Sequence, residues 1–177
     1  IADGTLDQLG IRAIWLTPFQ QNPEGAYIAA DNQHYVTGYH GYWPIRSTVV
    51  DPRFGTAAEL KALVATAHAR GIKVILDFVA NHVHENHPMI QAHPDWKTAL
   101  HLPDSTLNVR IWDAQRLTTW FDTFLPSLDF SKPEVIETQV DSAMFWIKEY
   151  GIDGFRHDAT KHIPLTFWRR LTQKLKT

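Results

Sequence analysis

Two short stretches of this sequence end apolar runs with clusters of ionisable side chains. They are Asp77–His82 and Gly154–His162. Each apolar run is typical of a buried strand, and parallel α/β folds place their chemistry at the ends of such strands. Carboxylates, imidazoles and a guanidinium gathered there could carry out acid–base or nucleophilic chemistry.

The pair of Arg156 and Asp158 is the first candidate for a reactive carboxylate. In an extended segment, residues two apart point to the same side, so both side chains would face one site. The guanidinium would hold Asp158 ionised and oriented, which a nucleophile requires. Taken alone, the pair fits a structural ion pair better than a catalytic one.

The segment Gly154–His162 resembles the nucleophile segment of the α-amylase family of retaining glycoside hydrolases. The family cleaves glycosidic bonds with two carboxyl groups. The resemblance implies that Asp158 becomes covalently glycosylated and that Arg156 supports it. It places Lys161 and His162 on the leaving-group side of the cleft. His157, where the family usually has an apolar residue, would point away from Asp158.

The segment Asp77–His82 resembles the family's other strand-end motif. The resemblance implies that His82 hydrogen-bonds the sugar at the cleaved position and that Asp77 organises the site from below. It implies that Asn81 binds a structural calcium ion. Without the resemblance, this cluster could equally be a generic metal site or a polar core.

The segment Tyr39–Trp43 resembles the loop that follows the second barrel strand of the family. The second tyrosine of that loop stacks on the sugar in the cleavage subsite. The resemblance gives this role to Tyr42, and it places Trp43 and His40 beside the same sugar.

The segment Leu125–Asp129 resembles a short calcium-associated motif, in which Asp129 would be a ligand. Ser127 stands where the family often has a second Asp. The implied calcium set is Asn81, Asp129 and the backbone carbonyl of His162. At least one further oxygen is expected from residues 83–130. Such oxygens are the ligands that Ca²⁺ prefers. Asp129 alone could equally be a carboxylate flanking a helix.

Strands and helices alternate among the elements that must position these groups. Apolar runs predict buried strands at 11–16, 72–79 and 152–155, and helical patterns predict helices near 3–10, 56–71, 131–150 and 164–176. Capping-box patterns begin at Thr56 and Ser131. Residues 20–54 are expected to be a long irregular loop. Alternating strands and helices indicate a parallel sheet with right-handed crossovers. Three such strands could form an arc of a barrel or a small open sheet.

The fold expected from the resemblance is α/β, part of a (β/α)8 TIM barrel that covers about strands 2–4. Residues 1–82 and 131–177 would be barrel segments, and 83–130 an inserted domain B after strand 3. The family's acid/base Glu would lie beyond Thr177, and the chain opens at Ile1 rather than Met. We therefore expect these residues alone to be inactive and marginally folded.

Composition and charge narrow the class of partner. The net charge is −2 and no basic run is present, which argues against a nucleic-acid partner. No apolar run approaches the roughly 20 residues that span a membrane. There are no cysteines, and no signal peptide is recognisable. The resemblance implies an α-glucan or maltooligosaccharide substrate, a structural calcium ion, and a secreted or periplasmic location.

Three other functions are open at this stage. A glucanotransferase of the same family would share the covalent intermediate and pass it to a sugar acceptor. A non-catalytic, amylase-like binding module is a second alternative, although Asp158, Arg156 and His82 weigh against it. A metal-dependent hydrolase built on Asp77, Asn81 and His82 is a third alternative. It would leave Arg156 and the Tyr42 loop unexplained.

Overall fold

The computed structural model describes residues 1–177 and centres on a three-stranded parallel sheet with the order β1–β6–β7. The strands are β1 (Ala13–Leu16), β6 (Lys73–Phe78) and β7 (Gly154–His157). The register sets Asp77 of β6 opposite Arg156 of β7. This sheet confirms the predicted α/β fold class and corresponds to an arc of a (β/α)8 barrel.

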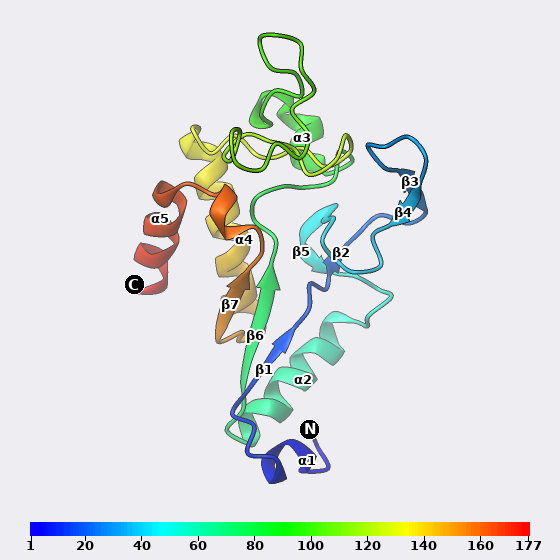
Figure 1. Cartoon of the computed structure of the whole chain (residues 1–177). Coiled ribbons are helices and arrows are strands. Elements are labelled where there is room, and N and C mark those ends of the chain that lie inside the picture. The colour runs from blue at the N-terminus through cyan, green and yellow to red at the C-terminus, as the bar shows by residue number, and fades with distance from the viewer.

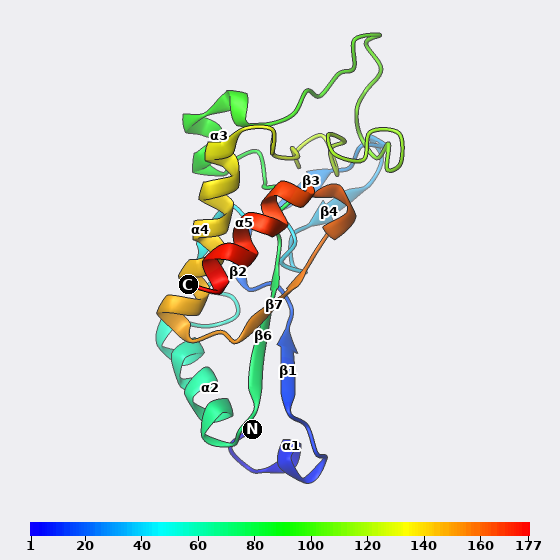
Figure 2. The ribbon, with the colours of Figure 1, turned by 90° about the vertical axis from the view of Figure 1, so that its left-hand side faces the viewer.

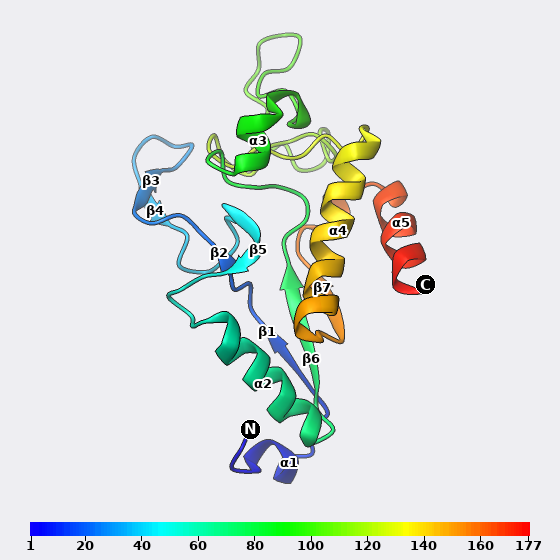
Figure 3. The same cartoon turned by 180° about the vertical axis from the view of Figure 1, so that it is seen from behind.

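Helices cover one face of the sheet. The long helices α2 (Ala57–Ala69) and α4 (Pro133–Tyr150) lie across that face, and α5 (Leu165–Leu175) packs beside α4 (Figure 3). The short helix α1 (Thr5–Gln8) precedes β1. The main core joins apolar side chains of β6 to residues of these helices such as Trp146 and Phe167. No helix has both the length and the apolar character needed to cross a bilayer.

The two predicted capping boxes have different outcomes. Thr56 caps α2 as expected, because its hydroxyl accepts from the Glu59 amide at 3.2 Å while its own amide donates to the Glu59 carboxylate at 2.8 Å. The prediction for Ser131 is wrong. Helix α4 begins at Pro133 without a side-chain cap, and the Ser131 hydroxyl donates to Asp129 at 2.6 Å instead.

The opposite face of the sheet carries no helix (Figure 2). Strand β1 was expected to be buried, but its side chains alternate between the two faces. Ile14 and Leu16 pack against the helix-covered core, whereas Trp15 is 56% exposed on the open face. The Arg156 guanidinium lies 5.3 Å from the centroid of the Trp15 ring, so Arg156 shares this open face.

Residues 20–54 are more ordered than expected. Strand β2 (Gln20–Gln21) pairs antiparallel with β5 (Arg46–Val50), and β3 (Ala26–Ile28) pairs antiparallel with β4 (Tyr35–Thr37). These strands have two to five residues, which is too short for a clear alternating pattern. The β3–β4 hairpin lies toward the end of the molecule at which the sheet strands point (Figure 1).

The region 83–130 lies beyond the carboxyl ends of the strands (Figures 1 and 2). It contains helix α3 (Pro88–Ala92) and the 3₁₀ turn η1 (Pro94–Trp96). Isolated bridges, such as His82 with Ser127 and Val109 with Trp120, hold the remainder of this region together. A second 3₁₀ turn, η2 (Thr160–His162), follows β7.

Candidate functional site

A cavity of about 680 Å³ lies at the carboxyl ends of the sheet strands. Its volume is in the range of about 300–1,000 Å³ that is usual for small-molecule sites. Five of the residues predicted for substrate contact or catalysis line it: His40, Tyr42, Trp43, His82 and Asp158. Segments far apart in the sequence therefore contribute side chains to one site.

Arg156 connects this cavity to a fully buried carboxylate. Its Nη1 donates to both oxygens of Asp77, at 2.8 and 3.0 Å, and to Asp158 Oδ1 at 3.1 Å. Asp77 is 0% exposed and also accepts from the Tyr42 hydroxyl at 2.8 Å. Paired residues on neighbouring strands thus place Arg156 between two carboxylates, and only that of Asp158 faces the cavity.

This arrangement keeps Tyr42 neutral and Arg156 charged. Burial, followed by the hydrogen bond to Asp77, raises the pKa of Tyr42 to about 12. The hydrogen bond to Asp77 raises the pKa of Arg156. At neutral pH the site therefore contains a phenol that donates to one carboxylate and a guanidinium that faces two.

Two imidazoles beside Asp158 are held neutral. Burial lowers the pKa of His82, and the negative charge of Asp158 opposes this shift only in part. His82 Nε2 lies 3.0 Å from the Tyr42 carbonyl, to which it donates, and its ring stacks on Phe121 with centroids 4.4 Å apart. Burial also lowers the pKa of His40, whose Nδ1 accepts from the Tyr42 amide at 3.0 Å.

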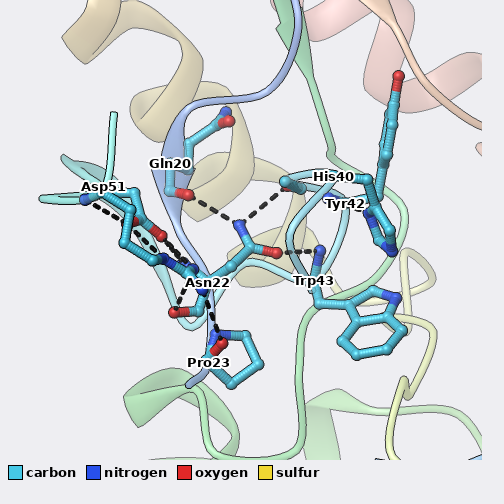
Figure 4. Close-up of polar contacts among 9 residues, drawn as sticks. Gln20, Asn22, Pro23, His40, Tyr42, Trp43 and Asp51 are labelled. Carbon is cyan, nitrogen blue, oxygen red and sulfur yellow. Dashed lines mark hydrogen bonds and ion pairs between the residues drawn. The ribbon is translucent and has the colours of Figure 1, made fainter. Parts of the chain in front are cut away.

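Asn22 fixes the loop that carries Tyr42 (Figure 4). Its amide nitrogen donates to the carbonyls of Gln20 at 2.7 Å and Gly41 at 2.9 Å. Its side-chain oxygen accepts from the Trp43 amide at 2.6 Å. The Asn22 backbone amide in turn donates to the buried Asp51 carboxylate at 3.0 Å. One buried side chain thus joins the end of β2 to the loop on both sides of Tyr42.

Gly41 permits the close approach of this loop to the chain after β1. Its φ is +89°, and a Cβ there would come within 2.1 Å of the Pro18 carbonyl oxygen. Only glycine can take both the left-handed conformation and the contact.

Lys161 and His162 do not line the cavity; they face the region 83–130. Lys161 Nζ lies 3.4 Å from Asp113. His162 is 5% exposed, and its Nδ1 donates to the Arg116 carbonyl at 2.7 Å. The guanidinium of Arg116 donates back to the Lys161 carbonyl. The two residues predicted for the leaving-group side therefore lie at the contact between η2 and the region 83–130.

The residues expected to hold calcium have separate partners in the structure. The Asn81 amide nitrogen donates to Ser127 at 3.0 Å, and the Ser127 hydroxyl donates to the Thr119 carbonyl at 2.6 Å. Asp129 accepts from the Ser131 amide and hydroxyl. No group of three or more His, Cys, Asp or Glu side chains is gathered to hold a metal. With a neutral serine beside Asn81, Asp129 is the only carboxylate of the expected set, and it accepts from Ser131. The set therefore falls short of the six to eight oxygens that Ca²⁺ takes.

Nine further residues complete the lining of the cavity, and the sequence analysis assigned a function to none of them. They are Tyr35, Val36, Thr37 and Tyr39 near the β3–β4 hairpin, and Arg110, Trp112, Phe121, Asp122 and Leu125 of the region 83–130. The aromatic content of both segments was a signal, but neither segment has a helix or strand period that would show which side chains face inward.

Comparison with known proteins identifies the family of this chain. A family model described as the catalytic domain of α-amylase matches residues 5–174. α-Amylase 2 of Dictyoglomus thermophilum is 31% identical over 176 residues, covering 97% of this chain and 27% of the relative. A cyclomaltodextrin glucanotransferase of Geobacillus stearothermophilus is 30% identical over 192 residues, covering 99% of this chain and 26% of the relative.

Solved structures agree with these matches. The α-amylase of Geobacillus thermoleovorans, in complex with acarbose, superposes with a TM-score of 0.79 at 39% identity, covering 99% of this chain and 36% of that one. The chain thus spans about a third or less of the length of these relatives. The match over nearly all of its residues places the chain in the α-amylase family, glycoside hydrolase family 13.

Proposed function

We propose that Asp158 is the nucleophile of a retaining reaction on α-1,4-linked glucans. The observation that carries this proposal is its position. The Asp158 carboxylate lines the cavity and accepts a hydrogen bond from Arg156 at 3.1 Å. Arg156 would hold the carboxylate in a fixed orientation, because its other contacts, to the buried Asp77, fix the guanidinium.

In the first step, an Asp158 oxygen forms a bond to the anomeric carbon while the bond from that carbon to the glycosidic oxygen breaks. The departing oxygen takes up a proton from a general acid. Water then attacks the same carbon from the other side, releases Asp158 as a carboxylate and gives its proton to the residue that acted as acid. The neutral Tyr42 and His82 would contact the sugar at this position.

We propose that the proton donor comes from outside these residues. Of the side chains that line the cavity, only Asp122 and Asp158 are acidic. Asp122 accepts from Arg110 at 2.7 Å and from the Thr123 amide at 2.8 Å, so both of its carboxylate oxygens have partners within the protein. Asp77 is fully buried. These 177 residues alone would then be inactive, because general-acid catalysis is worth about 10²–10⁴-fold.

An α-glucan or maltooligosaccharide is the proposed substrate, since relatives named as amylases and a structural relative that carries acarbose share this arrangement of segments. Transfer to a sugar acceptor uses the same covalent intermediate, and a glucanotransferase is among the relatives. A structural calcium ion is not part of the proposed machinery, because Asn81 pairs with Ser127 and Asp129 with Ser131.

The stereochemistry of the product tests the proposal. Proton NMR of fresh hydrolysate from the full-length protein acting on maltoheptaose should show the α-anomer first, and Asp158→Asn should lose nearly all activity. Asp113→Asn is the matched control, because Asp113 is 97% exposed and does not line the cavity. Initial formation of the β-anomer, or an active Asp158→Asn variant, would overturn the assignment.

A further inference from the structure

A second cavity, of about 230 Å³, lies between β5, α3 and α4. It shares no lining residue with the cavity that contains Asp158, so the proposed chemistry does not use it. Its lining includes Arg46 and Ser47 of β5, His87, which caps α3, and Gln139 of α4. A cavity of this size has room for several water molecules or for a small ion.

Gln139 brings an amide without a partner to this second cavity. Gln139 is 1% exposed, its Oε1 has no hydrogen-bond partner, and its amide nitrogen makes no hydrogen bond within the protein either. Burying a polar group without a partner destabilises a fold, so such a group needs a partner from outside the chain. The amide can turn about its last torsion and present either its N–H groups or its oxygen to that partner.

Arg46 supplies the charge of the second cavity. Its side chain is exposed and makes no hydrogen bond or ion pair within the protein. Burial, followed by the positive charge of Arg46, lowers the pKa of His87 to about 4, so His87 is neutral at neutral pH. No Asp or Glu lines the cavity. The charge at its surface is therefore positive and uncompensated, which favours an anion.

Ser47 adds a neutral donor beside Arg46. The Nδ1 atom of His87 accepts from the Met89 amide at 3.1 Å, so Nε2 carries the proton of the neutral ring. His87 Nε2 lies 3.1 Å from Ser47 Oγ, to which it therefore donates. This direction excludes His87 as a base for Ser47, and it leaves the proton of the Ser47 hydroxyl free to donate to a ligand.

We propose that Arg46, Ser47 and Gln139 bind a small oxyanion, a phosphate or a carboxylate, in the second cavity. The guanidinium of an arginine matches the geometry of both kinds of anion, and the hydroxyl and the amide supply further N–H or O–H donors. Because Arg46 and Ser47 belong to β5 and Gln139 belongs to α4, the bound anion joins these two elements and stabilises the folded protein. The inference does not depend on the proposed action on α-glucans.

Calorimetry on the full-length protein tests the site, with inorganic phosphate in one titration and acetate in another, at neutral pH and constant ionic strength. We expect saturable binding of at least one of the two anions, and the comparison of the titrations shows whether the site takes a phosphate or a carboxylate. Arg46→Met should weaken this binding at least about tenfold. Arg12→Met is the matched control, because Arg12 is also exposed, has no ion pair and lies outside the cavity. The absence of saturable binding for both anions, or equal affinity in Arg46→Met and the wild type, would overturn the inference.

Thermal unfolding separates binding at this site from the general stabilisation that phosphate gives to proteins. Specific binding should raise the melting temperature of the wild type until the site is saturated, whereas the general effect continues to grow with concentration. Gln139→Leu should fold, because leucine is similar in size and needs no hydrogen-bond partner, and it should lose the saturable part of the rise, as should Arg46→Met. A saturable rise of the same size in both variants and in the wild type would contradict the site.

Discussion

Arg156 and Asp77 are joined by two hydrogen bonds from a single guanidinium nitrogen, at 2.8 and 3.0 Å. They lie directly opposite each other on neighbouring parallel strands. Asp77 is fully buried, whereas the Arg156 side chain is 40% exposed and reaches Asp158 with the same nitrogen. The buried carboxylate therefore holds the guanidinium that orients the cavity-lining carboxylate.

Replacing Asp77 should lower activity although Asp77 does not line the cavity. In Asp77→Asn, the amide cannot hold Arg156 with two accepted hydrogen bonds, so Asp158 loses its orientation. We expect kcat to fall by about 10–100-fold, the usual effect of removing a residue that orients a functional side chain. Steady-state kinetics on maltoheptaose with the full-length protein measures this.

Asp153→Asn is the matched control for this prediction. Asp153 is a partly buried carboxylate just before β7, where it accepts from Lys73 and the Val74 amide, both at 2.8 Å. Its loss should reduce stability and leave kcat unchanged. An Asp77→Asn variant with wild-type kcat would show that Arg156 does not need Asp77 for the orientation of Asp158.

Asn22 should matter for stability and for catalysis because it holds the loop around Tyr42. Asn22→Ala leaves the Trp43 amide and the carbonyls of Gln20 and Gly41 without this partner. We expect a loss of about 2–4 kcal/mol in the free energy of unfolding, since each unsatisfied buried group costs about 1–3 kcal/mol. We also expect a lower kcat, because Tyr42 is no longer held against Asp77.

Urea unfolding measures the loss of stability in Asn22→Ala, and steady-state kinetics on the same preparation measures the loss of kcat. Asn86→Ala is the control, because the exposed side chain of Asn86 makes no hydrogen bond within the protein. If Asn22→Ala unfolds at the same urea concentration as Asn86→Ala, the Asn22 network does not hold the loop.

Helices and strands whose residues follow a regular apolar pattern could be predicted from the sequence. The apolar run before Asp77 and the capping box at Thr56 predicted β6 and α2 correctly. The resemblance to one family directed attention to Tyr42, His82 and Asp158, which the fold then brings to one cavity. Their mutual positions depend on the register of parallel strands, which a local pattern does not contain.

Contacts between distant irregular segments could not be predicted. The partnership of Arg110 with Asp122 depends on how residues 109–122 fold back on themselves, and no period marks that path. Strand β1 was expected to be buried because its residues are apolar, but Trp15 lies on a face without helices. Apolar character indicated a strand there without indicating which of its faces is covered.

His157 should make the protein less stable in mild acid. Burial, helped by the charge of Arg156, lowers the pKa of His157 to about 4, and its Nδ1 has no partner beside Trp168. An unfolded histidine has a pKa of about 6.5. Between about pH 6.5 and pH 4, the unfolded chain takes up a proton that the folded protein does not, so the free energy of unfolding falls as the pH falls.

His157→Phe should make the free energy of unfolding depend less on pH, because phenylalanine fills similar space and does not titrate. The slope should decrease rather than vanish, since burial also lowers the pKa values of His84 and His87 to about 4. Urea unfolding over this pH range measures the slope. A variant as acid-sensitive as the wild type would contradict the role given to His157.

The stability of the site around Asn81 should not depend on calcium. Asn81 is paired with Ser127 rather than with a carboxylate, so Asn81→Ala should leave unchanged any effect of excess EDTA on the melting temperature of the full-length protein. Ser127→Asp adds the missing negative charge beside Asn81 and should create a melting temperature that rises with calcium. Calcium-dependent melting of the wild type that is lost in Asn81→Ala would refute this account of the Asn81 site.

Covalent trapping tests the central claim most directly. The full-length protein is incubated with a 5-fluoro-α-glucosyl fluoride, which forms the glycosyl-enzyme and slows its hydrolysis, and the digested protein is analysed by mass spectrometry. We predict one added glycosyl group on the peptide that contains Asp158, and none in Asp158→Asn. A glycosyl group on a different residue, or turnover of the reagent by Asp158→Asn at the wild-type rate, would contradict the assignment of Asp158 as the nucleophile.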